Sequence, residues 1–139
     1  MADQRDLNTQ RYQQGLEIRK KVLGTAYVEN AIAQADEFSK PLQQLLTEYC
    51  WGTIWADSTL SLQQRSMLNL AMITALNRPH ELKLHVKGAL RNGLNHEQIR
   101  EVLLQAAIYC GVPAAVDSFR IARQAIEEFA QEELLEQGQ

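Results

Sequence analysis

The stretch from Ser61 to Gly93 constrains the fold most, because it predicts two consecutive helices separated by a proline. Ser61 and Gln64 have the spacing of a capping box, in which each side chain bonds a free backbone N–H at a helix start. From there to Leu76 the apolar residues surround the helix axis instead of forming a stripe. That pattern is typical of a helix enclosed by its neighbours, so we expect this helix to form the centre of the core.

Pro79 marks the point where the second helix should begin. A proline disfavours helical backbone at the preceding Arg78 and suits the first turn of a new helix, so the chain should turn near Asn77 and restart. At about 100° per residue the restarted helix has one apolar face and one basic face. The apolar face carries Leu82, Val86, Ala89 and Leu90, and the basic face carries Lys83, Lys87 and Arg91.

Two histidines of this second helix are predicted to have different surroundings. His85 falls at the margin of the apolar face, one turn from Glu81, whereas His80 points to the solvent side. Only His85 is therefore placed for chemistry, as a group that exchanges a proton near neutral pH. The alternative is a half-buried structural histidine that is hydrogen-bonded to Glu81, and spacing does not separate the two.

Composition indicates an ordered, single-domain protein. The 139 residues suffice for one core, with a first helix in 1–24, a core in 25–130 and a polar tail in 131–139. With 45% hydrophobic residues and a net charge of -3, the chain lacks the basic surface that nucleic acid requires. The N-terminus has no apolar signal segment, and no run could span a bilayer. We expect a cytoplasmic protein with no nucleic-acid or membrane partner.

The cysteines and histidines are too dispersed to predict a disulfide or a metal site. Cys50 and Cys110 lie far apart in apolar helical contexts, so we expect reduced, buried thiols. The three histidines, His80, His85 and His96, should point in different directions, so no metal is expected.

Caps and breakers predict the other helices. Asn95 and Gln98 repeat the capping-box spacing, Gly24 suits the end of a first helix, and Gly111 with Pro113 breaks another. No strand-like alternation of apolar and polar residues occurs. The fold class is therefore all-α, with about six to seven helices and no sheet. The further expected ranges are 6–23, 27–36, 41–56, 96–110 and 114–134.

The helix expected over 41–56 groups a carboxylate with two tryptophans. Glu48, Trp51 and Trp55 stand at i, i+3 and i+7, so they should share one helix face. The alternative is that both tryptophans are core or subunit-interface residues and Glu48 reaches solvent. Gly52 could let another backbone approach closely. The predicted core stripe of this helix is Leu42, Leu45, Leu46 and Tyr49.

Three stretches carry a resemblance to a known family. They are EYCWGTIWA at 48–56, SLQQRSMLNLAM at 61–72, which contains Arg65, and NRPHELKLHVKGALRNGLNHEQIREVLLQAAIYCGVPAAV at 77–116. Together they resemble the carboxymuconolactone decarboxylase family, over most of the chain from about Gly24 to Phe129. The resemblance implies the all-α fold of the alkylhydroperoxidase D-like superfamily, whose members assemble as trimers or hexamers.

The resemblance also implies a reaction. It is the decarboxylation of 4-carboxymuconolactone to β-ketoadipate enol-lactone, in the protocatechuate branch of aromatic catabolism. Loss of carbon dioxide sends electrons through the double bond onto the lactone carbonyl oxygen, and a proton then adds at the carbon α to that carbonyl. Because the conjugated carbonyl accepts the electrons, no cofactor is expected. The implied partner is a small lactone dicarboxylate.

The substrate that the resemblance implies calls for three kinds of group, and the chain offers candidates for each. Arginine suits the two carboxylates, a donor in a dry site stabilises the oxyanion, and histidine supplies a proton near neutral pH. His85 is the expected proton donor or oxyanion partner. The supporting residues are Glu48 or Glu81 to orient it, Arg65 and Arg78 to bind carboxylates, and Trp51 and Trp55 to wall the pocket.

Two alternatives stay open. Thiol-dependent hydroperoxide reductases of the same superfamily carry a Cys-x-x-Cys pair before the helix histidine. When that histidine is aligned with His85, Arg78 and Glu81 stand where the cysteines would be, which favours the decarboxylase. A reductase would have to use Cys50 or Cys110. The second alternative is a non-catalytic, metabolite-binding helical oligomer.

We expect a homotrimer or a homohexamer. Both tryptophans and every face of the helix at 61–76 are difficult to bury in a single layer of helices. Part of that apolar surface should therefore be covered by another copy of the chain.

Overall fold

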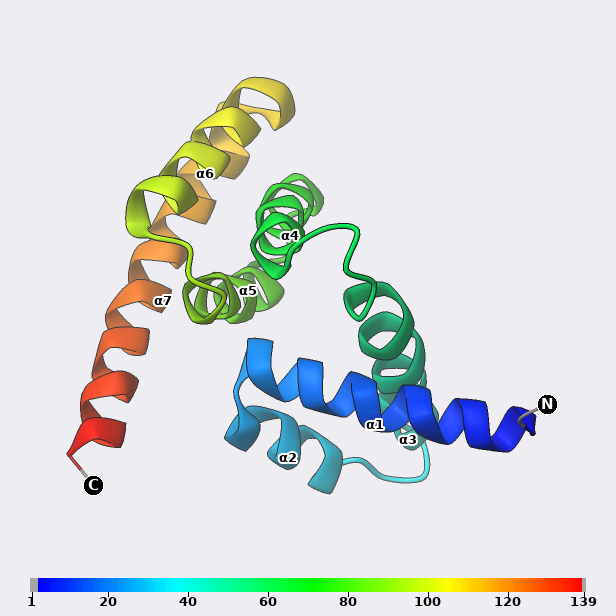
Figure 1. Ribbon diagram of the computed structural model, residues 1–139. Coiled ribbons are helices and arrows are strands. Elements are labelled where there is room, and N and C mark those ends of the chain that lie inside the picture. Colours follow the sequence, from blue (N-terminus) through cyan, green and yellow to red (C-terminus); the bar gives the residue numbers. More distant parts are fainter. Residues whose placement is uncertain (1–2, 139) are drawn as a thin grey trace. The chain divides into compact units, whose positions relative to one another are not determined.

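The protein is helical along almost its whole length (Figure 1). The computed structural model describes residues 3–138. Within them lie seven α-helices, one π-helix and no strand, which confirms the predicted all-α class. None of these helices is long and apolar enough to cross a membrane. The helices are α1 (Gln4–Leu23), α2 (Thr25–Ala33), α3 (Lys40–Leu45), η1 (Leu46–Trp55), α4 (Leu62–Leu76), α5 (Pro79–Arg91), α6 (His96–Cys110) and α7 (Val112–Gln137).

Helix ends follow the predicted caps and breakers. α1 ends at Gly24, whose φ of 94° is a conformation that glycine tolerates best. The turn between α4 and α5 places Asn77 at a φ of 55°, and Pro79 opens α5. At the start of α6 the Asn95 side chain accepts a hydrogen bond from the Gln98 N–H at 2.8 Å, and the Gln98 side chain accepts one from the Asn95 N–H at 2.9 Å. The predicted capping box is confirmed there.

The chain divides into two compact units, one ending at Ser61 and the other beginning at Leu62. In the first unit α1 packs mainly against η1, and α2 folds back beside α1 (Figure 1). The α1–η1 contact is between backbones. A Cβ added at Gly15 would overlap the Thr47 carbonyl oxygen, and one added at Gly52 would overlap the Arg11 carbonyl oxygen. The close approach predicted at Gly52 is confirmed.

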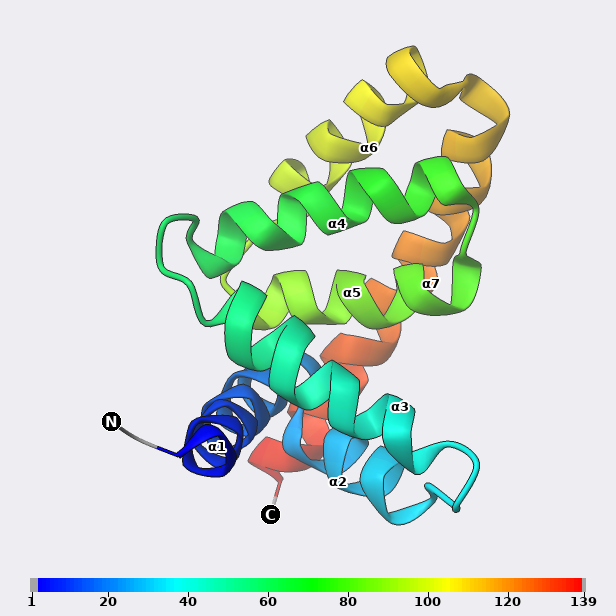
Figure 2. The same ribbon diagram turned by 90° about the vertical axis from the view of Figure 1, so that its right-hand side faces the viewer.

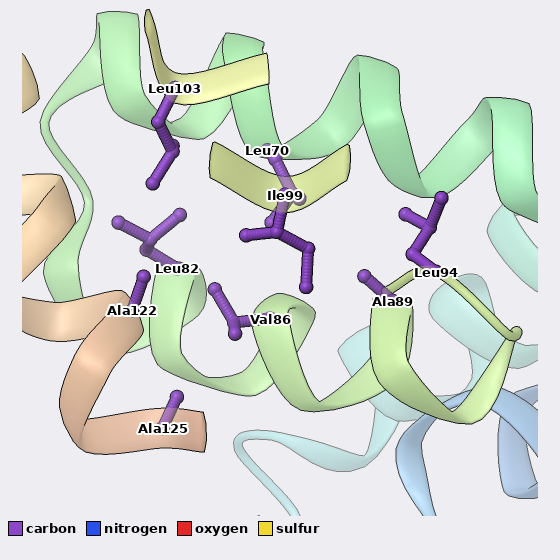
Figure 3. Close-up of a cluster of buried hydrophobic side chains, with 9 residues drawn as sticks. All are labelled: Leu70, Leu82, Val86, Ala89, Leu94, Ile99, Leu103, Ala122 and Ala125. Carbon is purple, nitrogen blue, oxygen red and sulfur yellow. The ribbon is translucent and has the colours of Figure 1, made fainter. Parts of the chain in front are cut away.

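In the second unit α4 and α5 lie side by side, and α6 and α7 form a helical hairpin (Figure 2). Side chains from all four helices, and one from the α5–α6 loop, point toward one another and form the core (Figure 3). The alanines of α7 let that helix approach closely. The buried cluster consists of Leu70, Leu82, Val86, Ala89, Leu94, Ile99, Leu103, Ala122 and Ala125.

Helix α4 is buried on one face only, so the expectation that it is enclosed on every side is wrong for the single chain. Its neighbours in the second unit, chiefly α5 and α6, cover one side. The buried residues recur at every fourth position of the helix. The exposed residues also recur at every fourth position, and each stands two positions after a buried one. The buried face carries Ser66, Leu70 and Thr74, and the exposed face carries Leu68, Met72 and Leu76.

The helix expected over 41–56 is instead α3 followed by the π-helix η1. The predicted core stripe is wrong, because the side of η1 that meets α1 is the side of Gly52 and Thr47. The opposite side is left open. Leu42, Leu45 and Tyr49 are exposed and Leu46 is half-buried.

Candidate active site

His85 lies on α5 between buried apolar neighbours. Leu82 and Val86 on the same helix belong to the core, and His85 itself is 8% exposed. His80, one and a half turns earlier, is exposed. The predicted difference between the two histidines is therefore confirmed, and His85 is buried more deeply than its position at the edge of the apolar face suggested.

The surroundings of His85 favour its neutral form. Burial lowers the pKa of His85, and the negative charge of Glu81, one turn away, opposes this with a smaller effect. An imidazole in this state carries one N–H donor and one acceptor nitrogen at neutral pH. It can donate a hydrogen bond to a growing negative charge without first taking up a proton.

The basic face of α5 is occupied by α7. Lys87 Nζ lies 2.7 Å from Glu132 and 3.0 Å from Glu128, and Arg91 stands over the Phe129 ring at 5.4 Å from its centroid. Hydrogen bonds from Lys83 and then Lys87 lower the pKa of Glu128. These cations hold α5 against α7. A substrate would therefore have to be bound by other arginines.

The predicted carboxylate-binding arginines lie in the second unit with His85. Arg78 is the exposed residue that precedes α5, one turn before Glu81 and two before His85. Arg65 is half-buried on α4. A guanidinium at the start of α5 adds to the positive end of the helix dipole, which favours an anion there.

Trp51 and Trp55 stack on each other in the first unit and do not share a face with Glu48. Their ring centroids are 4.6 Å apart with an interplanar angle of 24°, and both are buried. A π-helix has more residues per turn than an α-helix. Trp51 and Trp55, which are four residues apart, therefore lie on nearly the same side of η1, and Glu48 lies on another side. The predicted grouping is therefore wrong, and the alternative of core tryptophans fits. Their role as pocket walls stays a prediction.

Glu48 instead lines a cleft of the first unit with a volume of about 710 Å³. The Glu48 carboxylate accepts a hydrogen bond from the Gln44 amide at 3.1 Å. The cleft has a small negative balance of charge, which disfavours a dianionic substrate. Its charged lining residues are Asp36, Glu37 and Glu48 against Arg5 and Lys40. The assigned role of Glu48 as an orienting acid stays a prediction.

Arg19 of α1 is a buried cation that the sequence analysis missed. It is 3% exposed, and its Nη1 donates a hydrogen bond to the Thr47 hydroxyl at 3.2 Å. Burial lowers the pKa of Arg19. A signal was present, because Arg19 stands four residues after Gly15 and three before Val22, both of which are buried on the same face of α1. The polar composition of the helix concealed that face.

Thiol chemistry finds little support in the positions of the cysteines. Cys50 is half-buried in the first unit, and burial raises the pKa of its thiol, which keeps it protonated at neutral pH. Cys110 is exposed, so its predicted burial is wrong: it is the last residue of α6, where the chain turns away. Among residues 3–138, no cluster of three or more His, Cys, Asp or Glu side chains could hold a metal ion.

Known proteins are similar to this chain over most of its length. The sequence model of the Carboxymuconolactone decarboxylase family matches residues 40–124. A nitrosuccinic acid decarboxylase of Metarhizium robertsii is 40% identical over 123 residues, which are 88% of this chain and 86% of that protein. A 4-carboxymuconolactone decarboxylase of Acinetobacter baylyi is 30% identical over 119 residues, 86% of this chain and 89% of that protein. Both of these relatives are decarboxylases.

Proposed function

The chain belongs to the carboxymuconolactone decarboxylase family, and we propose that it is a cofactor-free decarboxylase of a small dicarboxylic acid. The similarity to two decarboxylases along almost the whole chain carries this proposal. A buried, neutral histidine on α5 supports it, because decarboxylation needs a donor for the charge that develops on the substrate.

The substrates named for the two relatives share one kind of chemistry. Each carries two carboxylates, one of which is attached to a carbon that can pass electrons to an acceptor. In 4-carboxymuconolactone the acceptor is the conjugated lactone carbonyl, and in nitrosuccinic acid it is the nitro group. In both, the bond to the departing carboxylate breaks, carbon dioxide leaves, the electron pair moves to oxygen of the acceptor, and a proton then adds to carbon.

We assign His85 the role of hydrogen-bond donor to that acceptor oxygen. A neutral imidazole N–H can stabilise the developing charge in a site from which water is excluded. Glu81 then acts through its charge on the imidazole. Arg65 and Arg78 are the proposed partners of the substrate carboxylates, for which a guanidinium offers a bidentate fork.

Two substrates are candidates. 4-Carboxymuconolactone is the first, with a place in protocatechuate catabolism, since the long runs at 48–56 and 77–116 resemble the enzymes that use it. Nitrosuccinic acid is the second, and the higher identity of 40% against 30% favours it.

A direct assay decides between them. Freshly generated 4-carboxymuconolactone is followed by its ultraviolet absorbance, nitrosuccinic acid is supplied in parallel, and released carbon dioxide is measured in both. A reaction without protein gives the spontaneous rate. We expect carbon dioxide release above that rate from at least one of the two acids. Release from neither, by protein shown to be folded, would contradict the proposed function and favour a metabolite-binding role.

A further inference from the structure

The first unit contains a cleft that the proposed decarboxylation does not use. It has a volume of about 710 Å³ and is lined by residues of α1, the end of α2, the α2–α3 loop, α3 and η1. All of its lining residues belong to the first unit, so the cleft is complete within that unit. A volume of this size is typical of a site for a small molecule.

The charged residues of this cleft differ in burial. Glu48 of η1 is half-buried, whereas Arg5, Asp36, Glu37 and Lys40 are exposed at its rim. The two cations and the two acids of the rim balance each other, so the excess charge of the cleft is the negative charge of Glu48. The enclosed part of the cleft therefore favours a cation, and the rim also offers cations to an anion.

Two groups of the enclosed part can accept hydrogen bonds. The Glu48 carboxylate accepts one from a neutral donor, the Gln44 amide, at 3.1 Å, and it has room for more. Gln43 also lines the cleft, and its Oε1 is buried and has no hydrogen-bond partner within residues 3–138. A buried acceptor without a donor is costly. Both groups are thus suited to a ligand that brings N–H donors.

The remaining walls favour an organic ligand. Tyr12 of α1 is half-buried in the lining, and an aromatic ring attracts an organic ammonium group. Ile32 and Ala35 add apolar surface, against which a hydrocarbon chain can pack. A metal ion fits less well, because no group of three or more His, Cys, Asp or Glu side chains among residues 3–138 could hold one.

We propose that this cleft binds an amino acid whose ammonium and carboxylate groups are separated by several carbon atoms. The ammonium donates to Glu48 and, once the amide has rotated slightly, to Gln43. The carboxylate lies at the rim, where Arg5 and Lys40 supply cations. The proposal is independent of the proposed function, and it gives Glu48 a binding role in place of the orienting role predicted from the sequence.

The spacing of the charges sets the length of the ligand. Lys40 opens α3 and Glu48 lies in the first turn of η1, which continues α3 directly. At about 1.5 Å of rise per residue their backbones are at most about 12 Å apart, and the flexible lysine side chain covers part of that distance. A chain of about five carbon atoms has the length that remains.

Titration calorimetry with three probes tests the proposal. 5-Aminopentanoate carries both charges, pentylamine carries only the ammonium, and pentanoate carries only the carboxylate. We expect saturable binding of 5-aminopentanoate, weaker binding of pentylamine and the weakest binding of pentanoate. The proposal is overturned if the wild type shows no saturable binding of 5-aminopentanoate at about millimolar concentration, or if pentanoate binds equally well.

Glu48→Gln tests the carboxylate, because it removes the charge and keeps the size of the side chain. We expect the affinity for 5-aminopentanoate to fall at least about tenfold, the loss typical of a charge-assisted hydrogen bond. The matched control is Glu17→Gln, the same change at an exposed position of α1 outside the cleft, which should bind like the wild type. Equal binding by all three proteins overturns the proposal.

A second variant keeps the test decisive if Glu48→Gln has a lowered melting temperature or fails to fold. Lys40→Met changes an exposed residue and removes a partner of the ligand carboxylate only. It should weaken the binding of 5-aminopentanoate and leave that of pentylamine equal or stronger. Wild-type binding of 5-aminopentanoate by Lys40→Met would then overturn the proposal. None of these measurements needs turnover, so they hold even if neither candidate substrate is decarboxylated.

Discussion

His85 and His80 stand five residues apart on one helix and differ in burial, so they form a matched pair for mutagenesis. If His85 stabilises the developing charge, His85→Ala should lower kcat at least about 100-fold. His80→Ala should change it little. His85→Gln keeps an N–H donor and should retain more activity than His85→Ala. Wild-type turnover by a folded His85→Ala protein would return His85 to a structural role.

The pH dependence of kcat tests the protonation state of His85. Burial lowers its pKa below the usual 6.5, and the charge of Glu81 limits that effect. If the neutral form is active, kcat should stay level above pH 6.5 and fall only in more acidic solution. Glu81→Gln removes the opposing charge, so the acidic limb should move to still lower pH. A limb that moves upward would contradict this account.

The stability of the fold must be measured over the same pH range as kcat. The direction in which stability changes with pH follows from the pKa of His85. His85 has a lower pKa in the folded chain, so the unfolded chain takes up the proton first as the pH falls below 6.5. Stability therefore begins to fall at a higher pH than activity, which declines only when His85 of the folded chain takes up its proton. Melting temperatures at each pH separate loss of activity from loss of fold.

Sequence periodicity predicted single residues where the helix is a regular α-helix. His85 and His80 were distinguished correctly because α5 has 3.6 residues per turn and a clear apolar face. Glu48 was misplaced because η1 has a wider turn, which no residue pattern indicated. Arg19 was missed because its burial depends on a close backbone contact at Gly15, on a helix whose other positions are mostly polar.

At the scale of elements, the backbone contact between α1 and η1 should tolerate no added methyl group. Gly15→Ala and Gly52→Ala each place a Cβ against a backbone carbonyl oxygen, which cannot rotate away as a side chain can. Overpacking of this kind costs about 1–3 kcal/mol. We expect lower urea midpoints for both variants. Gly138→Ala, whose Cβ would have ordinary contact distances, is the control.

An unchanged urea midpoint in Gly15→Ala would mean that α1 and η1 separate without cost.

Caps and breakers predicted the bounds of most helices, as at Gly24, Pro79 and Asn95, because each acts through its own backbone. The turn type of η1 and the register of its contact with α1 depend on two helices at once. Local sequence signals do not contain that information.

At the scale of the whole molecule, the second unit exposes large apolar side chains on several of its helices. Ile108 and Tyr109, at the end of α6, are 79% and 83% exposed. Val112, in the first turn of α7, adds to this patch, and α4 presents a second apolar face with Leu68 and Met72. Exposed apolar side chains that gather on a protein surface are typical of interfaces.

We propose that copies of this chain assemble through these faces into a homotrimer or a homohexamer. Closed symmetry would cover the same patch on every copy. Light scattering at micromolar concentration should give a mass of three or six chains. Ile108→Glu places a charge in the apolar patch and should shift the mass toward the single chain, because a buried, unpaired carboxylate is costly. Gln105→Glu adds the same charge at an exposed polar position of α6 and should leave the assembly intact. A wild-type monomer at that concentration would contradict the proposal, and the apolar faces would then need another partner.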